Sequence, residues 1–523
     1  MRVESRVVFW AVVAHGLVTL AITHLFNHPT FEFIAAAGSV GAAVMGCRQL
    51  TCVEGSHNTP WMLVSLLLGA LAGLIATVSI YFETNWPPRV DAAAGAAVTA
   101  AIVALAFFAP GKGDINDRLL RIAIGLPPAW AIPLFFRRLA RLGDWYEIPV
   151  TPLVPVMAVV AALAASYFVD PDPGRRTPAR IRFPILMLVW SGLAGWIIVR
   201  LPVPDIDVLM VQQAASAELL RAENPYAAVH PDIKWKPGID GESIRAGDGT
   251  KSFPYPPLSL ILVIPGWLAG DVRWSLLAAQ LGATVAVVAA GRRLGLAAGH
   301  PAELVAATIL FDPWGPLMVY RSFTEPLLAL TAGLTLWAVA AGLGRTAGLF
   351  LLASVTVKQF GIFWALPILA AGRIPVRALI LGTIVAAAII LPFLIADPGA
   401  FRLGVYITLA SGPPRSESLS LTAALSRATG RPISPFVGVA IAAAVAAPIL
   451  FQVRRVPSLA LATLGSAAIF LTLIVTGKAA NTKYFWFASF LLLASIVLAC
   501  GEASADHSAD PEEPVPPPLQ SPA

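Results

Sequence analysis

Charged residues are scarce in this chain. Only 13% of its 523 residues are Asp, Glu, Lys or Arg, against about 25% in soluble globular domains. Hydrophobic residues make up 57%, and many apolar runs have about 17–20 residues, enough to cross a hydrocarbon core about 30 Å thick. A lipid-exposed backbone must satisfy its own hydrogen bonds, which favours helices. The composition therefore excludes a soluble globular protein and predicts an all-α fold, a polytopic transmembrane helix bundle of about 15–16 spans.

Cysteine and the common cofactor signatures are also scarce. There are three cysteines and no C-x-x-C pair, so neither a zinc site nor a disulfide framework is indicated. Neither a GxGxxG fingerprint nor a P-loop occurs, so no nucleotide site is predicted. The net charge of +6 comes without a basic stripe interleaved with aromatics; it is typical of the positive-inside rule and not of nucleic-acid binding. We expect no cofactor and no nucleic acid, and a divalent metal is not indicated.

Residues 1–170 predict an N-terminal membrane module of roughly six spans, whose role the sequence leaves open. Its fifth span, about 119–136, contains three prolines and could instead be re-entrant. The segment 171–182 is rich in Pro, Gly and Arg and is typical of a cytoplasmic linker. It separates the module from a second membrane domain, 183–500, and residues 501–523 predict a disordered cytoplasmic tail. The module's histidines have no metal-ligand spacing and suggest structural roles: His15, His24, His28 and His57.

The longest polar interval, residues 200–257, follows a hydrophobic span at 183–199. Because the basic linker before that span is predicted to be cytoplasmic, the polar interval should be extracytoplasmic, provided that the fifth span crosses the membrane. Asp205 and Asp207 stand just past the end of the span, where a membrane helix meets water. Residues 208–221 then predict an amphipathic helix that lies in the interface. This loop is the first candidate for a catalytic face.

Further apolar runs predict spans or partial spans at about 258–270, 275–291, 302–318, 326–343, 347–357, 360–371, 376–395, 436–452, 457–476 and 483–500. The first of these runs is short, contains Pro265 and could be re-entrant.

A few charged residues interrupt these runs. A charge at bilayer depth costs roughly 2.5–3.5 kcal/mol on insertion scales, so such residues usually face a cavity or a partner. Arg321 and Glu325 stand between two apolar runs, where either a salt bridge or a functional role would explain them. Lys358 and Gln359 have no polar neighbours for several residues, which favours a phosphate-binding lysine over one that only snorkels. The polar residues before the last run suggest ordinary loop solvation: Lys478, Asn481, Lys483 and Tyr484.

Carboxylates and cations around one membrane-facing cavity suit the transfer of a sugar from a lipid-linked phosphate. A positioned carboxylate can take the proton of the attacking hydroxyl, which contributes about 10²–10⁴-fold to a rate. Lys or Arg can stabilise the negative charge of the departing phosphate. A single base without a covalent intermediate implies inversion at the anomeric carbon. The pattern therefore predicts an inverting transferase.

The order of short motifs resembles the C-type superfamily of polytopic glycosyltransferases that use polyprenyl-phosphate sugars. The motifs are NPY at 224–226, FPYPPL at 253–258, TEP at 324–326 and the isolated Lys358-Gln359 pair. Over residues 180–500 the chain is most similar to bacterial polyprenol-phosphate-mannose-dependent mannosyltransferases.

The resemblance implies that an outer-loop aspartate is the catalytic base. Asp207 fits the spacing to NPY better than Asp205, and a shared role stays open. Lys358 would bind the donor phosphate. The resemblance and the pattern together give a substrate-binding set of Glu325, Arg321, Lys358, Gln359 and Tyr255.

The predicted function is that of an inverting glycosyltransferase in the plasma membrane with an extracytoplasmic active site. It would move mannose, or alternatively arabinose, from a polyprenyl-phosphate donor to an envelope lipid, glycan or protein acceptor. The alternative is a transporter or flippase of lipid-linked saccharides, for which inverted repeats with broken helices would be expected.

Overall fold

A computed structural model gives the fold of the chain. Every regular element in the described residues is helical and no strand occurs there, so the predicted all-α class is confirmed. Within the part of the chain that the structure describes, six helices are long and apolar enough to cross a membrane, and six further apolar helices are shorter. Asp205, the predicted spans at about 61–81 and 92–109 and all but one residue of 31–47 lie outside the described residues. The structure describes residues 3–22, 42, 115–148, 153–169, 177–204, 206–228, 253–407, 418, 420–429, 434, 436–477 and 481–509.

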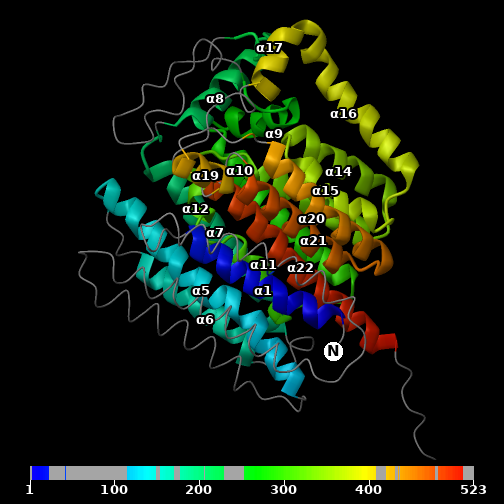
Figure 1. The fold of residues 1–523 in the computed structure, drawn as a ribbon. Helices are drawn as coiled ribbons and strands as arrows, with labels where there is room; N and C mark the ends of the chain where they lie inside the picture. Colours follow the sequence, from blue (N-terminus) through cyan, green and yellow to red (C-terminus); the bar gives the residue numbers. More distant parts are fainter. Residues whose placement is uncertain are drawn as a thin grey trace, which may run out of the picture.

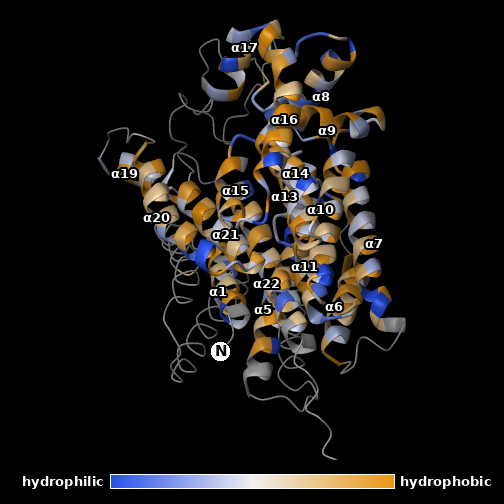
Figure 2. Cartoon of the chain, turned by 90° about the vertical axis from the view of Figure 1, so that its right-hand side faces the viewer, coloured by the Kyte–Doolittle hydropathy of each residue, from blue (hydrophilic) through white to orange (hydrophobic). Residues whose placement is uncertain are grey.

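The long helices run side by side and give the bundle two ends (Figures 1 and 2). The loop end carries α8 (Asp207–Leu220) and the start of α9 (Pro257–Leu268). The tail end carries the last turn of α10 (Arg273–Arg293) and the C-terminal part of α22 (Thr482–Ala509). In Figure 2, α8 and α9 lie at the top and the N-terminus lies at the bottom. The predicted interfacial helix at 208–221 corresponds to α8 and is confirmed as a helix.

Helix α5 (Ile115–Trp145) is continuous and reaches both ends of the bundle, although it contains three prolines. At the tail end, burial and, to a smaller extent, the charge of the nearby Arg121 lower the pKa of His300 to about 4. At the loop end, the hydroxyl groups of Tyr146 and Tyr320 form a hydrogen bond. The fifth predicted span is therefore a single continuous helix, and the topology that depends on its crossing the membrane stays a prediction.

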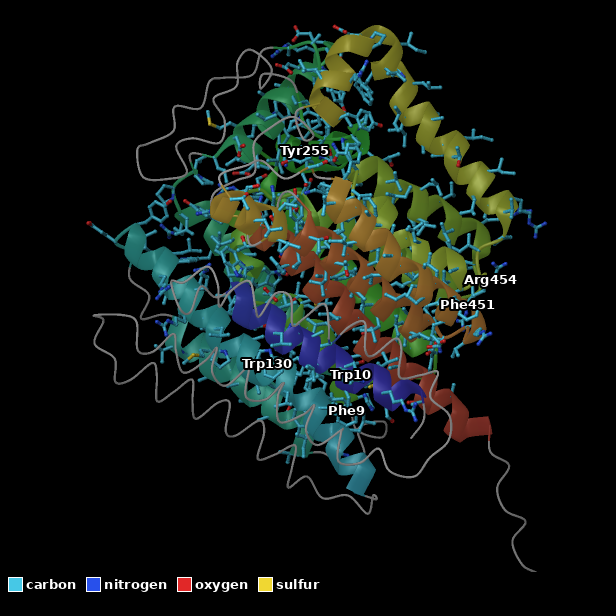
Figure 3. All side chains as sticks on the ribbon, in the orientation of Figure 1. Phe9, Trp10, Trp130, Tyr255, Phe451 and Arg454 are labelled. Carbon is cyan, nitrogen blue, oxygen red and sulfur yellow. The ribbon has the colours of Figure 1, made fainter. Side chains whose placement is uncertain are left out.

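The first helix, α1 (Val3–Ile22), packs against α5 and α22. Trp130 of α5, labelled in Figure 3, donates its indole N–H to Nδ1 of His15 at 3.1 Å, and both side chains are buried. His15 therefore has the structural role that its isolated position predicted.

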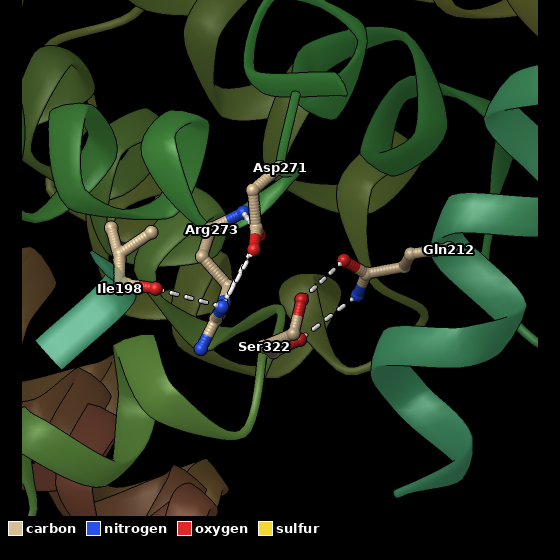
Figure 4. A network of polar contacts seen from close by, with 5 residues as sticks. All are labelled: Ile198, Gln212, Asp271, Arg273 and Ser322. Carbon is tan, nitrogen blue, oxygen red and sulfur yellow. Dashed lines mark hydrogen bonds and ion pairs between the residues drawn. The ribbon is translucent and has the colours of Figure 1, made fainter. Parts of the chain in front are cut away.

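Helix α9 lies across the loop end and does not cross the bundle. Arg273, which follows it, donates from Nη2 to the carbonyl of Ile198 at 3.1 Å, at the end of α7 (Thr177–Arg200). The same guanidinium pairs with Asp271 at 2.6 Å (Figure 4). Both ends of α9 are thus at the same end of the bundle. The short run 258–270 could have formed a span or a segment that does not cross the bundle. In the structure it does not cross the bundle.

The predicted span at 302–318 is broken into α11 (Pro301–Thr308) and α12 (Gly315–Tyr320). Asp312 and Pro313 lie between the two helices, and proline has no N–H to continue the helical ladder. The pair nevertheless leads from the tail end to the loop end.

The next three helices carry the residues of interest: α13 (Glu325–Ala340), α14 (Gly344–Val357) and α15 (Gly361–Ala370). Helix α13 starts at the loop end with proline in its first turn, a position that proline favours. Helices α14 and α15 form a hairpin that turns at Lys358. A Cβ on Gly361 would lie 2.4 Å from the carbonyl oxygen of Ser354, so this turn requires glycine.

Helix α22 continues to Ala509, so the prediction of a disordered segment from Gly501 is wrong for residues 501–509. Tertiary contacts extend the helix. The carboxylate of Glu502 accepts hydrogen bonds from the Ser458 hydroxyl at 2.6 Å and from the Leu459 N–H at 2.7 Å. Likewise α7 begins inside the predicted linker.

The remaining elements are α6 (Leu153–Val169), α16 (Val376–Ala396), α17 (Pro398–Arg402), the π-helical turn Leu403–Ile407, α19 (Leu421–Thr429), α20 (Phe436–Arg455) and α21 (Leu459–Thr476).

Candidate functional site at the loop end

A buried ion pair joins the start of α13 to the turn between α14 and α15. Nζ of Lys358 lies 2.5 Å from Oε1 of Glu325. The side chains are only 2% and 1% exposed, so neither charge is solvated by water. Glu325 is also in the first turn of α13, where the helix dipole favours a negative charge. The structure thus brings together two of the predicted substrate-binding residues.

The other donors of Lys358 are also engaged. Its ammonium donates to Oγ1 of Thr324 at 2.9 Å. It also lies over two aromatic rings, at 5.5 Å from the centroid of Tyr255 and 5.1 Å from that of Tyr484. Cation–π contacts of this kind stabilise a desolvated ammonium. The unused hydrogen-bond acceptor in this arrangement is Oε2 of Glu325. This atom is buried and accepts no hydrogen bond from the residues that the structure describes.

Gln359 connects this pair to two loops. Its amide Nε2 donates to the carbonyl of Pro254 at 3.2 Å and to that of Val405 at 2.7 Å. Tyr226 of the NPY motif donates its hydroxyl to the carbonyl of Tyr255 at 2.7 Å. The NPY, FPYPPL, TEP and Lys-Gln motifs therefore meet at the loop end, as expected if they form one site.

Replacing Gln359 with leucine should lower stability by about 1–3 kcal/mol, because the carbonyls of Pro254 and Val405 would lose a buried donor. Thermal unfolding of the purified protein in detergent measures the change. Gln213→Leu is the matched control, since Gln213 on α8 is partly buried like Gln359 but its side chain forms no hydrogen bond with the residues that the structure describes. Equal melting temperatures for the two variants would show that these bonds do not secure the loops.

Helix α8 is attached to the same region through a reciprocal pair of hydrogen bonds. Gln212 donates from Nε2 to the carbonyl of Ser322 at 3.0 Å, and the Ser322 hydroxyl donates to Oε1 of Gln212 at 2.9 Å (Figure 4). Ser322 has a φ of +57°, a left-handed conformation that costs a non-glycine residue energy. The two bonds hold this strained turn directly before Thr324 and Glu325.

Two of the three remaining predicted site residues, Asp207 and Arg321, lie at the same end of the bundle as this cluster. Asp207 is half-buried in the first turn of α8, and its Oδ1 accepts the backbone N–H of Val208 at 2.7 Å. It is on the same helix as Gln212, and therefore at the same end of the bundle as Lys358. Arg321 is half-buried at the end of α12, next to Ser322. Asp205 is outside the described residues.

The sequence reasoning missed two members of the site. Tyr484 is buried and lies over the ammonium of Lys358, and Lys483 lies 5.1 Å from the ring centroid of Phe323. The prediction of ordinary loop solvation was therefore wrong for the buried Tyr484, while Lys483 is half-buried. The reason is tertiary: α22 begins against the loop that precedes α13, and Tyr484 also packs against Phe360. Thr324, Gln212 and Tyr226 were not singled out either, although TEP and NPY include two of them.

Within the described ranges, no group of three or more His, Cys, Asp or Glu side chains could hold a metal ion. Comparisons of the chain with protein-family models, curated proteins and solved structures give no match.

Proposed function

We propose that this protein is an inverting glycosyltransferase of the membrane that takes its sugar from a polyprenyl-phosphate donor. One observation supports this most: four motifs far apart in the sequence contribute Tyr226, Tyr255, Glu325 and Lys358 to one region at the loop end. Such convergence of polar groups at the edge of an apolar bundle is typical of a functional site. Mannose is the first sugar to test and arabinose the second.

In the proposed reaction Asp207 accepts the proton of the acceptor hydroxyl. The acceptor oxygen forms a bond to the anomeric carbon while the bond from that carbon to the phosphate oxygen breaks. The lipid phosphate leaves with the electron pair, and the anomeric centre is inverted. Helix α8 holds the base, and its Gln212–Ser322 bonds fix it relative to Glu325.

We propose that the loop end faces away from the cytoplasm. The tail end carries exposed arginines at the ends of several helices, among them Arg293, Arg373 and Arg454. Positively charged residues at helix ends favour the cytoplasmic side. The plasma membrane is the corresponding location for an envelope-modifying enzyme.

A second candidate function is transport of a lipid-linked saccharide. The broken pair α11–α12 favours it, because transporters bind substrates at interrupted helices. Asp312 lies in this break, fully buried, and its Oδ2 has no hydrogen-bond partner in the described part of the chain.

One experiment separates the two functions. The purified chain is reconstituted in liposomes with radiolabelled polyprenyl-phosphate mannose or arabinose and total envelope lipid. Radiolabel in a new glycolipid with inverted anomeric configuration supports transfer. Movement of unchanged donor across the bilayer supports transport instead. If neither a new glycolipid nor movement of the donor is detected with either sugar, the proposal is contradicted.

A further inference from the structure

The break between α11 and α12 holds a buried carboxylate that the proposed sugar transfer does not use. Asp312 is 1% exposed. Its Oδ1 accepts the backbone N–H of Trp314 at 2.9 Å, and its Oδ2 has no hydrogen-bond partner among the described residues. No Lys, Arg or His side chain in the part of the chain that the structure describes forms an ion pair with it. A buried charge without a partner is costly, so this carboxylate requires compensation.

Gln280 of α10 adds a second buried oxygen beside the break. Its Nε2 donates to the carbonyl of Gly315, the first residue of α12, at 3.4 Å. The N–H of Gly315 donates in turn to the backbone carbonyl of Asp312 at 2.8 Å. Oε1 of Gln280 is buried and accepts no hydrogen bond from the described residues. Two hydrogen bonds through Gly315 thus connect two side chains that each keep an unused acceptor.

The break also frees a backbone carbonyl. Pro313 has no N–H, so the carbonyl of Ile309 lacks the donor that a continuous helix would place four residues further on. No described residue replaces that donor. Carbonyls at unwound points of membrane helices can coordinate sodium ions. The interruption therefore adds an oxygen of the kind that binds a cation.

The chemistry of these groups selects a monovalent metal cation. Oxygen atoms of carboxylates and carbonyls are ligands of hard cations. Water could donate hydrogen bonds to them, but it would leave the charge of Asp312 in place. Arg138 lies over the ring of Trp314, with Cζ 4.0 Å from the ring centroid, and forms no ion pair with Asp312. One positive charge neutralises one carboxylate, whereas a divalent ion would leave a net charge buried.

We infer that Asp312 and Gln280 bind one monovalent metal cation in the break between α11 and α12, with sodium as the probe. The cation would join α12 to α10. Helix α12 ends directly before the left-handed turn at Ser322 that precedes Glu325, so the cation would also steady the loop end. The inference does not rest on the proposed function, because it holds whether the chain transfers a sugar or moves a lipid.

Direct binding of sodium tests the inference. The full chain in detergent is titrated with radioactive sodium in choline chloride at mildly alkaline pH, where protons compete least for a carboxylate. The wild type should bind sodium saturably, with one ion per chain. Asp312→Asn keeps an acceptor for the N–H of Trp314 but removes the charge, and should abolish binding. Gln280→Leu should weaken the affinity by about tenfold, because one oxygen ligand is lost.

Gln452→Leu is the matched control for Gln280→Leu. Gln452 is buried, and its Oε1 also has no hydrogen-bond partner among the described residues. It belongs to α20 and not to the helices that form the break. This variant should bind sodium as the wild type does.

Thermal unfolding in sodium chloride and in choline chloride of equal concentration gives a second measurement. Sodium should raise the melting temperature of the wild type by about 2 °C or more, because a ligand that binds only the folded state stabilises it. Asp312→Asn should melt at the same temperature in both salts. In choline chloride it should melt no lower than the wild type, since the buried charge is gone.

Four outcomes would overturn the inference: no saturable sodium binding by the wild type, equal binding by Asp312→Asn, an equal loss of affinity in the Gln452 control, or equal melting temperatures of the wild type in the two salts. The last result would show that Asp312 is neutralised in another way, such as by a proton. If the asparagine variant does not fold, the sodium affinities of Gln280→Leu and Gln452→Leu still decide. Failure of the proposed sugar transfer would leave all these results unchanged.

Discussion

Asparagine in place of Asp207 is expected to reduce sugar transfer by about 10²–10⁴-fold, the contribution of a positioned general base. The substitution should leave the fold intact, because the amide oxygen can still accept the N–H of Val208, as Oδ1 of Asp207 does at 2.7 Å. The amide cannot accept the proton of an attacking hydroxyl. Initial rates with radiolabelled donor, together with thermal unfolding, separate chemistry from stability.

Two further variants show whether the effect belongs to Asp207. Glu223→Gln is the matched control in the same loop, since Glu223 is exposed and, among the described residues, pairs with Arg221. It should transfer sugar at the wild-type rate. Asp205→Asn tests the neighbouring carboxylate. Full activity in the Asp207 variant would exclude it as the base, and a loss confined to the Asp205 variant would assign the role there.

Lys358→Met is expected to destabilise the protein by about 3–5 kcal/mol. The reason is the carboxylate that remains: Glu325 is 1% exposed, and removing one partner of a buried ion pair leaves an uncompensated charge. The double variant Lys358→Met/Glu325→Leu removes both charges and should recover most of the loss. Unfolding of the wild type, the two single variants Lys358→Met and Glu325→Leu, and the double variant in detergent gives the coupling between the two residues.

The same double variant also tests whether the pair takes part in function. If it folds but transfers no sugar, the charges serve the reaction or the substrate and not only the fold. If it folds and transfers at the wild-type rate, the pair is structural. Single variants with additive effects on stability would contradict the pairing itself.

Local patterns predicted much of the fold. The interfacial helix expected at 208–221 is α8, Asp207–Leu220, and the span expected at 376–395 is α16, Val376–Ala396. Both follow from hydrophobic periodicity or from run length, which depend on neighbours in the sequence. The importance of Lys358 and Glu325 was also visible, because isolated charges in apolar surroundings need a partner.

Other features depended on contacts between distant segments. By its sequence Tyr484 resembled a solvated loop residue, but in the structure it packs over Lys358. Residues 501–509 resembled a disordered tail, but in the structure Glu502 caps the start of α21. The break at Asp312 lay within an apolar run that had the length of one span.

The sequence alone therefore determined an all-α membrane bundle, most of its helices and the motifs that could carry chemistry, because length, apolarity and periodicity are local properties. Only the tertiary structure decided which charges pair, which loops exclude water and which end of the bundle gathers the polar groups. Those outcomes depend on burial and distance between residues far apart in the chain, such as the 2.5 Å contact of Lys358 with Glu325.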